Sequence, residues 1–328
     1  MNDHTAYPAF TLILRKAFVL LIFAGLFASC KKEQPAENKY SLAGGYSIFV
    51  NGGNILVSGL KSENGQFSTK HWINGVNVDE SKFNDLLGNQ LGYRRAVDEK
   101  YRTVYTYKDR NGIIDSYQFD QGSGAQKGFM FYYKNNAKVQ LVNDKLGVLT
   151  AVSFNADKPI FAGSLGEMTS DITGGQSYVP RKAFTWDGIS LLKELLIPEK
   201  SILFWGVSTV YSYGPDEVYV GGLCGVPMYW KNANPVVLDK RYGEVWQITK
   251  AGSDVYAAGL INKQNSNSTG HTACFWKNET LHELEDNAQA YGIFVNGSDV
   301  YVTGSVGSVP VNYRPCYWKN GVRVDLPM

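Results

Sequence analysis

Histidine, cysteine and runs of like charge are scarce in this chain of 328 residues. It holds 4 histidines and 4 cysteines, and 32 basic residues nearly balance 30 acidic ones, for a formal net charge of +2. No His-x-His, Cys-x-x-Cys or His-Glu-x-x-His spacing is present for a metal, and no Asp-x-Asp-x-Asp loop for calcium. Nucleic-acid binding requires several phosphates to be neutralised together, which this balanced charge does not favour. We therefore expect no cofactor and no nucleic-acid partner.

Motifs of common hydrolases and nucleotide-binding proteins are also missing. There is no Gly-x-Ser-x-Gly elbow and no glycine-rich phosphate loop between a strand and a helix. The sialidase-type aspartate box, Ser-x-Asp-x-Gly followed by tryptophan, is missing. The segment Gly252-Ser253-Asp254-Val255-Tyr256 has Tyr256 where the box has its glycine. Catalysis by carboxylates that are far apart in the sequence remains open, since a repeat fold can bring acids from different repeats to the mouth of a central tunnel.

A single apolar run near the N-terminus, residues 17–26, is too short to span a bilayer but has the length of a secretory signal core. Arg15 and Lys16 precede this run, and Ala28-Ser29-Cys30 follow it. The small residues before Cys30 resemble the lipobox of bacterial lipoproteins. The resemblance implies cleavage before Cys30 and lipidation of its thiol and new amino group. The alternative is an ordinary signal peptide with an incidental cysteine.

The lipobox resemblance predicts how the protein is placed in the cell. It makes residues 1–29 a signal peptide and Cys30 a lipid anchor, so the first partner is a membrane. The implied location is the cell envelope of a Gram-negative bacterium, as an outer membrane lipoprotein facing the periplasm or the surface. Residues 30–40 are polar and contain a proline, so we expect a flexible tether.

Three cysteines remain after Cys30, namely Cys224, Cys274 and Cys316. Cys274 and Cys316 each stand two residues before a tryptophan, so alternation along a strand places each thiol on the tryptophan's face. We interpret them as buried core thiols, because free cysteine behaves as a small hydrophobe. A disulfide or a metal site is the alternative.

An aromatic residue that leads into a tight turn recurs along the chain. Tyr317-Trp318-Lys319-Asn320-Gly321 is followed by a short Val-x-Val-Asp strand, and Tyr291-Gly292-Ile293-Phe294-Val295 matches Tyr46-Ser47-Ile48-Phe49-Val50. Asn-Gly, Asp-Gly and Asn-Asn pairs supply the positive φ angles that two-residue hairpins require. Each repeat unit is therefore predicted to form four antiparallel strands.

Six such units can be aligned on the aromatic residue of their third strand. The six anchors are Trp72, Tyr133, Trp186, Trp230, Trp276 and Trp318, and the second strands centre near Val57, Val104, Phe161, Tyr219, Tyr256 and Tyr301. The second unit is the weakest match, because its second strand lacks the glycine of the others. A four-stranded meander repeated at this spacing is typical of a β-propeller. We predict an all-β, six-bladed propeller of four-stranded antiparallel blades that forms one domain over residues 41–328.

The second strands resemble those of bacterial β-propeller repeat proteins that carry an Asp-Val-Tyr-Val-x-Gly motif. The motif stands at 299–304, with copies at 254–259 and 217–222. Such families imply an exported propeller, often without assigned chemistry. The resemblance covers nearly all of the mature chain but is specific to the fold.

The recurrent tryptophans have two interpretations. They could be platforms for stacking carbohydrate, but packing between blades explains one large aromatic residue per blade without any ligand. Trp205 and Trp246 lie outside the repeated phrase and are better candidates for aromatic residues that face a ligand. Trp246 still falls within a first strand, which favours the core.

The loops between second and third strands vary most, so we expect function there. They are predicted at 61–68, 108–128, 165–181, 223–227, 261–272 and 306–314, on the face that also carries the crossovers between blades. We select Arg110, Asp171, His271, Tyr313 and Arg314 as candidate ligand-binding residues; Asp115, Glu167 and Lys263 lie in the same predicted loops. An ordinary solvated surface is the alternative. Residues 191–196 also have helical apolar spacing, and 80–101 has room for a short helix.

Three functional hypotheses follow. The first is a non-catalytic, lipid-anchored scaffold that binds a protein, glycan or other ligand on its loop-rich face. The second is a carbohydrate-active enzyme, a glycosidase or lyase, with two carboxylates from different blades about 5 to 10 Å apart. The third is a structural role in an envelope complex.

Overall fold

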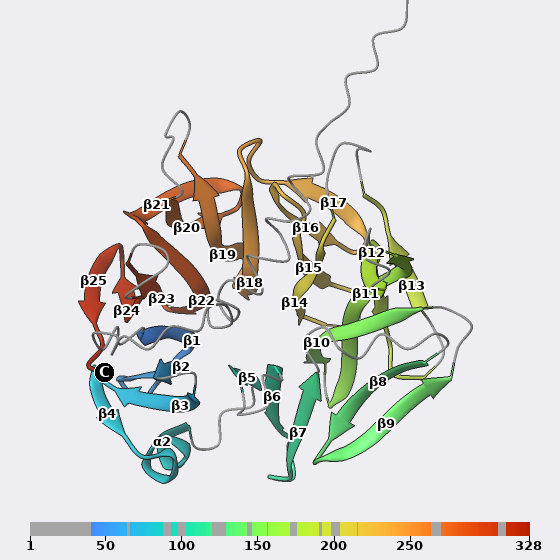
Figure 1. Cartoon of the computed structure of the whole chain (residues 1–328). Helices are drawn as coiled ribbons and strands as arrows, with labels where there is room; N and C mark the ends of the chain where they lie inside the picture. The colour runs from blue at the N-terminus through green and yellow to red at the C-terminus, as the bar shows by residue number, and fades with distance from the viewer. Residues whose placement is uncertain are drawn as a thin grey trace, which may run out of the picture.

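The computed structural model describes residues 41–328 except 64–65, 88–92, 98–102, 120–128, 143–145, 156, 171–175, 190–191, 198–203, 215, 264–269 and 308–312. The predicted signal peptide, the tether and Cys30 lie outside the described residues. Six antiparallel sheets follow one another along the described chain and stand around a central axis (Figure 1). The prediction of a six-bladed, all-β propeller is confirmed.

The first three sheets are built in chain order. Blade 1 contains β1 (Ser41–Asn51), β2 (Asn54–Glu63), β3 (Gln66–Ile73) and β4 (Val76–Val78). Blade 2 contains β5 (Tyr93–Val97), β6 (Thr103–Lys108), β7 (Ile114–Phe119), β8 (Phe129–Lys134) and β9 (Ala137–Val142). Blade 3 contains β10 (Gly147–Asn155), β11 (Lys158–Ser170), β12 (Gln176–Trp186) and β13 (Leu192–Leu195).

The last three sheets repeat the four-stranded meander. Blade 4 contains β14 (Gly206–Ser212), β15 (Val218–Leu223), β16 (Pro227–Lys231) and β17 (Asn234–Val237). Blade 5 contains β18 (Gly243–Ala251), β19 (Asp254–Asn262), β20 (His271–Lys277) and β21 (Thr280–Asp286). Blade 6 contains β22 (Ala288–Asn296), β23 (Asp299–Val306), β24 (Arg314–Lys319) and β25 (Val322–Asp325).

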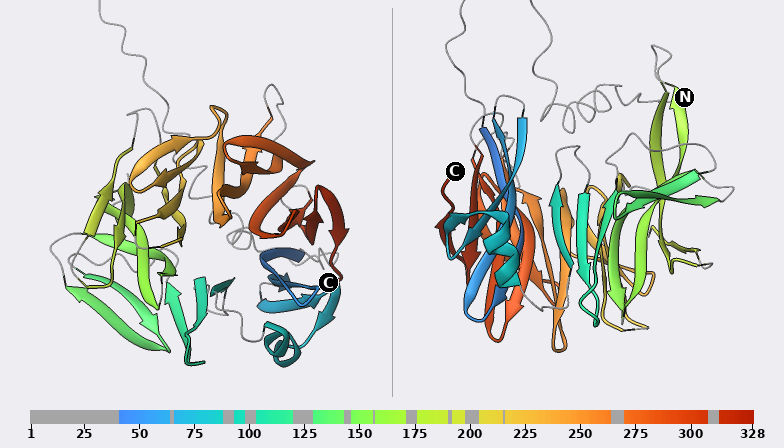
Figure 2. Two further views of the ribbon diagram at one scale, coloured as in Figure 1. Left: turned by 180° about the vertical axis from the view of Figure 1, so that it is seen from behind. Right: turned by 90° about the horizontal axis from the view of Figure 1, so that it is seen from below.

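The meander gives the ring two different faces, which the edge-on view in Figure 2 separates. One face carries the tight turns between strands one and two and between strands three and four; we call it the hairpin face. The other carries the connections from strand two to strand three and from one blade to the next; we call it the loop face. Because β1 begins at Ser41 on the loop face, the preceding chain joins the propeller there.

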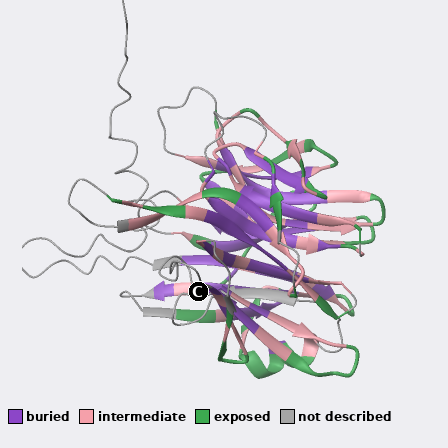
Figure 3. Cartoon of the chain, turned by 90° about the vertical axis from the view of Figure 1, so that its right-hand side faces the viewer, coloured by how far each residue is buried: buried purple, intermediate pink, exposed green. Residues whose placement is uncertain are grey.

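Packing between blades is the principal source of buried surface. Trp72, Trp230, Trp276 and Trp318 are at most 1% exposed, and each packs against side chains of the preceding blade. Figure 3 shows the buried residues along the middle of the sheets. Burying a large aromatic side chain stabilises the fold by about 3 kcal/mol or more. For these four tryptophans the packing interpretation is confirmed. Trp186 and Tyr133 are only partly buried.

The cysteine interpretation is also confirmed for the three described thiols. Cys224, Cys274 and Cys316 are free and at most 1% exposed. Cys274 shares a core cluster with Trp276, and Cys316 shares one with Trp318, as strand alternation predicts.

One predicted helix is found and one is not. Helix α2 (Glu80–Leu87) follows β4; the Asp79 Oδ1 accepts a hydrogen bond from the Lys82 amide, and Phe83 is fully buried. Residues 192–195, whose apolar spacing suggested a helix, instead form β13, the outer strand of blade 3. Pairing with β12 overrides the local preference, because the open edge of that blade needs a fourth strand. No helix in the described part of the chain is long and apolar enough to cross a membrane.

Blade 2 has five strands, not the four predicted. We predicted its second strand around Val104, with 108–128 as a variable loop. In the structure, 109–113 is a short turn and β7 follows it inside that range, so Asp115-Ser116-Tyr117 holds the position of Asp254-Val255-Tyr256 in blade 5. β5 is an additional strand at the inner edge of the sheet.

Other predicted loops are shorter than expected because their strands continue into them. β2 ends at Glu63 and β3 begins at Gln66. In blade 3, β11 ends at Ser170 and β12 begins at Gln176. Glu167 and Arg181 therefore lie on paired strands, where the Arg181 Nη2 is 2.6 Å from the Glu167 Oε1.

Candidate functional site

The repeated Lys-Asn phrase on the hairpin face is a structural clamp. In blade 6 the Asn320 Oδ1 accepts a hydrogen bond from the Val300 amide, and its Nδ2 donates to the Asp299 Oδ1. Asn74, Asn135 and Asn278 make the equivalent two contacts in blades 1, 2 and 5, each with an amide and a side-chain oxygen at the start of strand two. In blade 4, Asn232 accepts from the Val218 amide and donates to the backbone carbonyl of Asp216. All five have φ between 46° and 52°. The phrase is used for folding.

The lysine of the phrase completes the clamp. Lys277 and Lys319 each lie 2.9 Å from an aspartate at the start of strand two, Asp254 and Asp299. Hydrogen bonds from Lys277 and from Asn320 lower the pKa of the Asp254 and Asp299 carboxyls respectively. Lys134 and Lys231 make equivalent pairs with Asp115 and Glu217. In blades 2, 4, 5 and 6 the charged residues of the phrase are therefore engaged within the blade.

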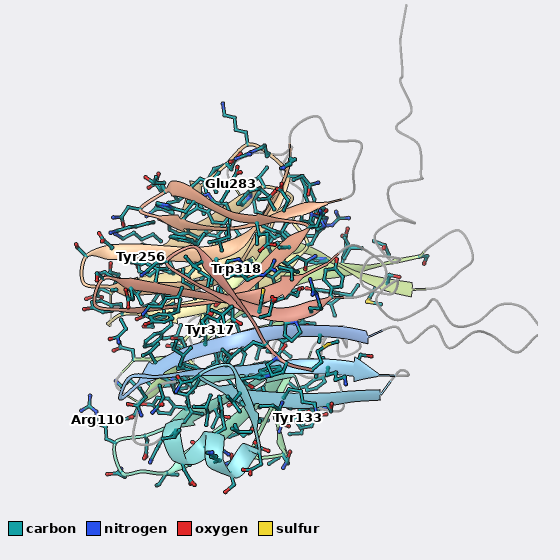
Figure 4. The ribbon with its side chains drawn as sticks, turned by 90° about the vertical axis from the view of Figure 1, so that its left-hand side faces the viewer. Arg110, Tyr133, Tyr256, Glu283, Tyr317 and Trp318 are labelled. Atoms are coloured by element: carbon teal, nitrogen blue, oxygen red, sulfur yellow. The ribbon has the colours of Figure 1, made fainter. Side chains whose placement is uncertain are left out.

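Arg110 is not on the face predicted for it. It lies in the turn between β6 and β7, on the hairpin face, where its Nε is 3.7 Å from the Asp157 Oδ2 in the corresponding turn of blade 3. Figure 4 shows its side chain pointing outward at the left-hand edge of the view. Asp115 also lies on the hairpin face, where it pairs with Lys134 and accepts a hydrogen bond from Asn135.

The remaining candidates lie on the loop face, with one exception. His271 begins β20, Arg314 begins β24 and is exposed, and Tyr313 accepts a hydrogen bond at its carbonyl from the Ala43 amide. Asp171 lies outside the described residues. Of these, His271 belongs to the cluster described below.

A β-bulge interrupts the innermost strand of five blades at the same position. The residue skipped in the pairing is Tyr46, Thr150, Ser208, Trp246 or Tyr291. A bulge residue is released from the strand ladder, so its side chain can be aimed in a new direction. The repeat therefore presents one re-aimed side chain from each of blades 1, 3, 4, 5 and 6.

The glycine of strand two is required by this bulge. A Cβ added at Gly259 would lie 1.9 Å from the Glu244 carbonyl oxygen, and one at Gly304 would lie 1.9 Å from the Gln289 carbonyl oxygen. Blade 2 has no such glycine at the matching position, and its described pairs show no bulge. The glycine of the Asp-Val-Tyr-Val-x-Gly motif thus leaves room for the carbonyl of the inner strand next to the bulge.

The bulge residues differ sharply around the ring. The Ser208 hydroxyl donates to the Val245 carbonyl of the next blade at 2.5 Å. Blades 5, 6 and 1 instead carry Trp246, Tyr291 and Tyr46. The ring centroids of Trp246 and Tyr291 are 5.8 Å apart, and those of Tyr291 and Tyr46 are 4.9 Å apart. All three aromatic residues are only partly buried, unlike the strand-three tryptophans of blades 1, 4, 5 and 6.

A second group of rings lies toward the loop face from Trp246. Tyr242, just before β18, is 5.7 Å from the ring of Trp205 and 6.4 Å from the ring of His271. The His271 Nδ1 is 2.6 Å from the Asn262 Oδ1, and burial lowers the pKa of His271, which keeps it neutral near pH 7. We call Tyr46, Trp205, Tyr242, Glu244, Trp246, His271 and Tyr291 the axial cluster.

Glu244 stands between the two groups of rings. It lies two residues after Tyr242 and two before Trp246, and the Tyr242 hydroxyl donates to its Oε1 at 3.2 Å. Burial raises the pKa of the Glu244 carboxyl to about 7, against the smaller opposing effect of the Tyr242 hydrogen bond. Asp239, three residues before Tyr242, is paired with Arg241. Glu244 has no basic partner among the described residues.

Most of this cluster was not recognised from the sequence. Trp205 and His271 were selected as candidates. Trp246 was named too, but the core was favoured for it, whereas the structure leaves it partly buried at a bulge. Tyr46, Tyr242, Glu244 and Tyr291 were not selected. A signal was available, because Tyr46-Ser47-Ile48, Trp246-Gln247-Ile248 and Tyr291-Gly292-Ile293 place an aromatic residue at one repeat position where Ser208 stands in blade 4. Only the bulge shows that this position leaves the core.

Fold and site together define a six-bladed propeller with an asymmetric aromatic cluster along its inner strands. No protein-family model matches the chain, and no curated protein does. Among solved structures it is similar to the β-propeller domain of the Trilobed protease from Pyrococcus furiosus, described as having an open velcro topology, with 9% identity and a TM-score of 0.40. That match covers 88% of this chain and 99% of that one.

Two peptidases are similar at the same level. Pyrococcus horikoshii acylaminoacyl peptidase matches 88% of this chain with 9% identity and a TM-score of 0.42. A puromycin-hydrolyzing peptidase of Mycobacterium tuberculosis matches 86% with 11% identity and a TM-score of 0.36. The chain spans about half the length of each, 52% and 53%. Likenesses this distant carry no argument about activity.

Proposed function

We propose that this protein is an exported, lipid-anchored propeller that binds a ligand or partner on its loop face without catalysis. The observation that carries the proposal is the contrast between the two faces. On the hairpin face the same clamp recurs in five blades and engages its polar groups. From the loop face to the middle of the inner strands, by contrast, partly buried rings depart from the repeat and lie around a carboxyl that has no basic partner among the described residues. Departure from repeat symmetry marks the functional region, because the fold itself does not require it.

The face can be tested without knowing the ligand. A photo-crosslinking amino acid is placed at Lys263 on the loop face, or at Val76 or Val322 on the hairpin face; both valines are more than 60% exposed. We expect adducts on the full-length protein in cells from Lys263 only. Adducts confined to Val76 and Val322, or none at any position, contradict the proposal.

Lipid anchoring is a separate part of the proposal and has its own test. The support is the apolar run 17–26 followed by Ala28-Ser29-Cys30. We expect mass spectrometry of the mature protein to find an acylated N-terminal Cys30, and Cys30→Ser to release the protein from membranes. An unmodified cysteine in a membrane-free protein rules the anchor out.

A second function, glycoside cleavage by paired carboxylates, has one observation in its favour. A carboxyl whose pKa is raised to about 7 by burial has the character of a general acid. The axial cluster contains Glu244 as its sole carboxyl, and burial rather than a neighbouring acid raises its pKa. The hypothesis requires a second acid from another blade within about 5 to 10 Å. Hydrolysis of a polysaccharide panel that is abolished by Glu244→Gln would favour it over simple binding.

A further inference from the structure

The axial cluster has a charge imbalance that indicates the chemistry of its ligand. Acids on the loop side of blades 4 and 5 are neutralised: Asp239 and Glu283 by Arg241, and Asp286 by Lys263. In the described part of the chain, Glu244 accepts a hydrogen bond from the Tyr242 hydroxyl and has no basic partner. A carboxylate in a partly buried site is stabilised by a positive charge. No basic side chain among the described residues supplies this charge to Glu244, which leaves the role to a bound ligand.

The surroundings of Glu244 are suited to an organic cation. Aromatic rings lie on both sides of it along β18, with Tyr242 and Trp205 toward the loop face and Trp246, Tyr291 and Tyr46 toward the hairpin face. Ring faces attract ammonium and guanidinium groups through their quadrupole. Each of these five aromatic residues retains some exposed surface.

Other classes of ligand fit less well. An anion would face the Glu244 carboxylate. Hard metal ions require several oxygen ligands, and no group of three His, Cys, Asp or Glu suited to a metal occurs among the described residues. A neutral sugar could stack on the rings, but it would leave the carboxylate without a counter-charge.

We propose that the axial cluster binds an organic cation, a protonated amine or quaternary ammonium group, with its positive charge against Glu244 and the aromatic rings around it. This inference rests on the proposed function and names the class of ligand. Trp246 and Tyr291 form one wall of the site and Tyr242 and Trp205 the other, while Tyr46 extends the first wall onto blade 1.

Among the described residues, Glu244 is the group that makes binding of a cation to this site depend on pH near 7. The titratable groups that face Glu244 are Tyr242 from its own strand entry, Cys224 from the β15–β16 turn and Tyr291 from β22. Burial raises the pKa of Cys224 to about 12 and raises that of Tyr291, so both stay neutral, as does His271 beside Tyr242. A cation binds the carboxylate form, and binding releases a proton near pH 7.

The test measures binding of defined probes to the full-length protein in detergent by titration calorimetry. The probes are tetramethylammonium and 1,5-diaminopentane, with a neutral trisaccharide as the alternative class. We expect a cation to bind saturably at about pH 8 and about tenfold more weakly at about pH 6, following the ionised fraction of Glu244.

Matched variants separate the site from the fold. We expect Glu244→Gln to weaken binding by about tenfold or more, and Glu167→Gln, a carboxyl on the loop side outside the cluster, to have no effect. Trp246→Leu should weaken binding and Trp246→Phe should restore it, since a ring is then present again. The restoration shows that loss in the leucine variant is not due to misfolding.

The outcomes distinguish this inference from the function on which it rests. Absence of saturable cation binding, or cation binding that is indifferent to Glu244→Gln, overturns the cation site. Trisaccharide binding that depends on Trp246, without cation binding, overturns it while leaving the loop-face function in place. Adducts restricted to the hairpin face in the crosslinking experiment remove the loop-face function itself.

Discussion

At the scale of single residues, the repeated asparagine is the most informative side chain of the hairpin face. Asn320 combines a positive φ of 52° with hydrogen bonds to both the Val300 amide and the Asp299 carboxylate. Asparagine tolerates this backbone region better than other residues with a side chain, and its amide can donate and accept at once. The same residue therefore shapes the turn and ties strand three to strand two.

Replacing this asparagine should separate its two roles. We expect Asn320→Ala to lower the free energy of unfolding by about 1–3 kcal/mol, since it removes both hydrogen bonds and strains the turn. Asn320→Gly keeps the positive φ without strain and should cost less. Urea unfolding monitored by tryptophan fluorescence measures both. Equal stability of the alanine variant and the native protein would show that the clamp contributes nothing.

Glu244 gives stability a defined pH dependence. Its pKa is raised from 4.5 in the unfolded chain to about 7 in the fold, so the folded state holds the proton more strongly. The contribution to stability is complete below about pH 4.5 and is lost as the pH rises through about 7. Relative to Glu244→Gln, the native protein should lose about 1–2 kcal/mol of stability across this window, less than the full shift because the side chain keeps some exposure. Parallel pH profiles of urea unfolding would refute this if the difference between the two proteins stayed constant.

At the scale of elements, the inner strand and its bulge are linked to the glycine of strand two. Gly259 pairs with Val245, immediately before the skipped residue Trp246. The carbonyl of Glu244 occupies the space that a side chain at 259 would need. Strand two therefore permits the bulge that aims Trp246.

We expect Gly259→Ala to destabilise the fold by about 2 kcal/mol or more, because the added methyl forces the backbone of β18 to move. It should also change the fluorescence of Trp246. Gly252→Ala is an instructive comparison, since an added Cβ meets nothing within 4 Å there and the loss comes from its φ of 59° alone. A large effect at 252 with none at 259 would contradict the link between glycine and bulge.

At the scale of the whole molecule, the ring closes without sharing a strand between its ends. Blade 1 is built entirely from the N-terminal segment of the propeller and blade 6 from the C-terminal segment. Contacts across the seam include the stacked rings of Tyr46 and Tyr291, the Ala43 amide bonded to the Tyr313 carbonyl, and the Trp72 Nε1 bonded to the Pro327 carbonyl at 2.8 Å. Leu326 is buried among Ile48, Trp72 and Tyr317.

Closure by side chains makes the last residues important for stability. We expect Leu326→Ala to cost about 2–5 kcal/mol, as for other buried leucines, and to speed hydrogen exchange in β1 and β24. The exposed Val322→Ala is the control and should change neither quantity. Unchanged exchange at the seam in Leu326→Ala would mean that the ring is held elsewhere.

The position of β1 also sets how a lipidated chain would meet a membrane. The 11 residues from Cys30 to Tyr40 join the propeller on the loop face and reach at most about 40 Å. A fluorophore attached through Lys263→Cys should therefore be quenched by lipid-borne quenchers more than one attached through Val322→Cys. The three buried cysteines, two with pKa raised and one well above its usual value, do not compete for the label. Stronger quenching from position 322 would reverse the inferred orientation.

Local chemistry in the sequence was sufficient for much of the fold. Asn-Gly pairs with positive φ, alternating strands and one aromatic anchor per unit determine six blades, because these signals act within about 50 residues and repeat. The same information failed in blade 2, where Asp115-Ser116-Tyr117 marks strand two but the alternating Tyr105-Thr106-Tyr107 placed the prediction near Val104. It failed again at 192–195, where a partner strand decides the structure.

The axial cluster was decided by tertiary structure. Tyr46, Trp246 and Tyr291 stand in three different blades, and nothing local in the sequence separates them from core aromatics. They come together because the ring closes and because each lies at a bulge that frees it from the strand ladder. The raised pKa of Glu244 has the same origin, since burial among neighbouring blades is a property of the assembled ring. The sequence by itself determined the blades; the way they pack around one axis determined the site.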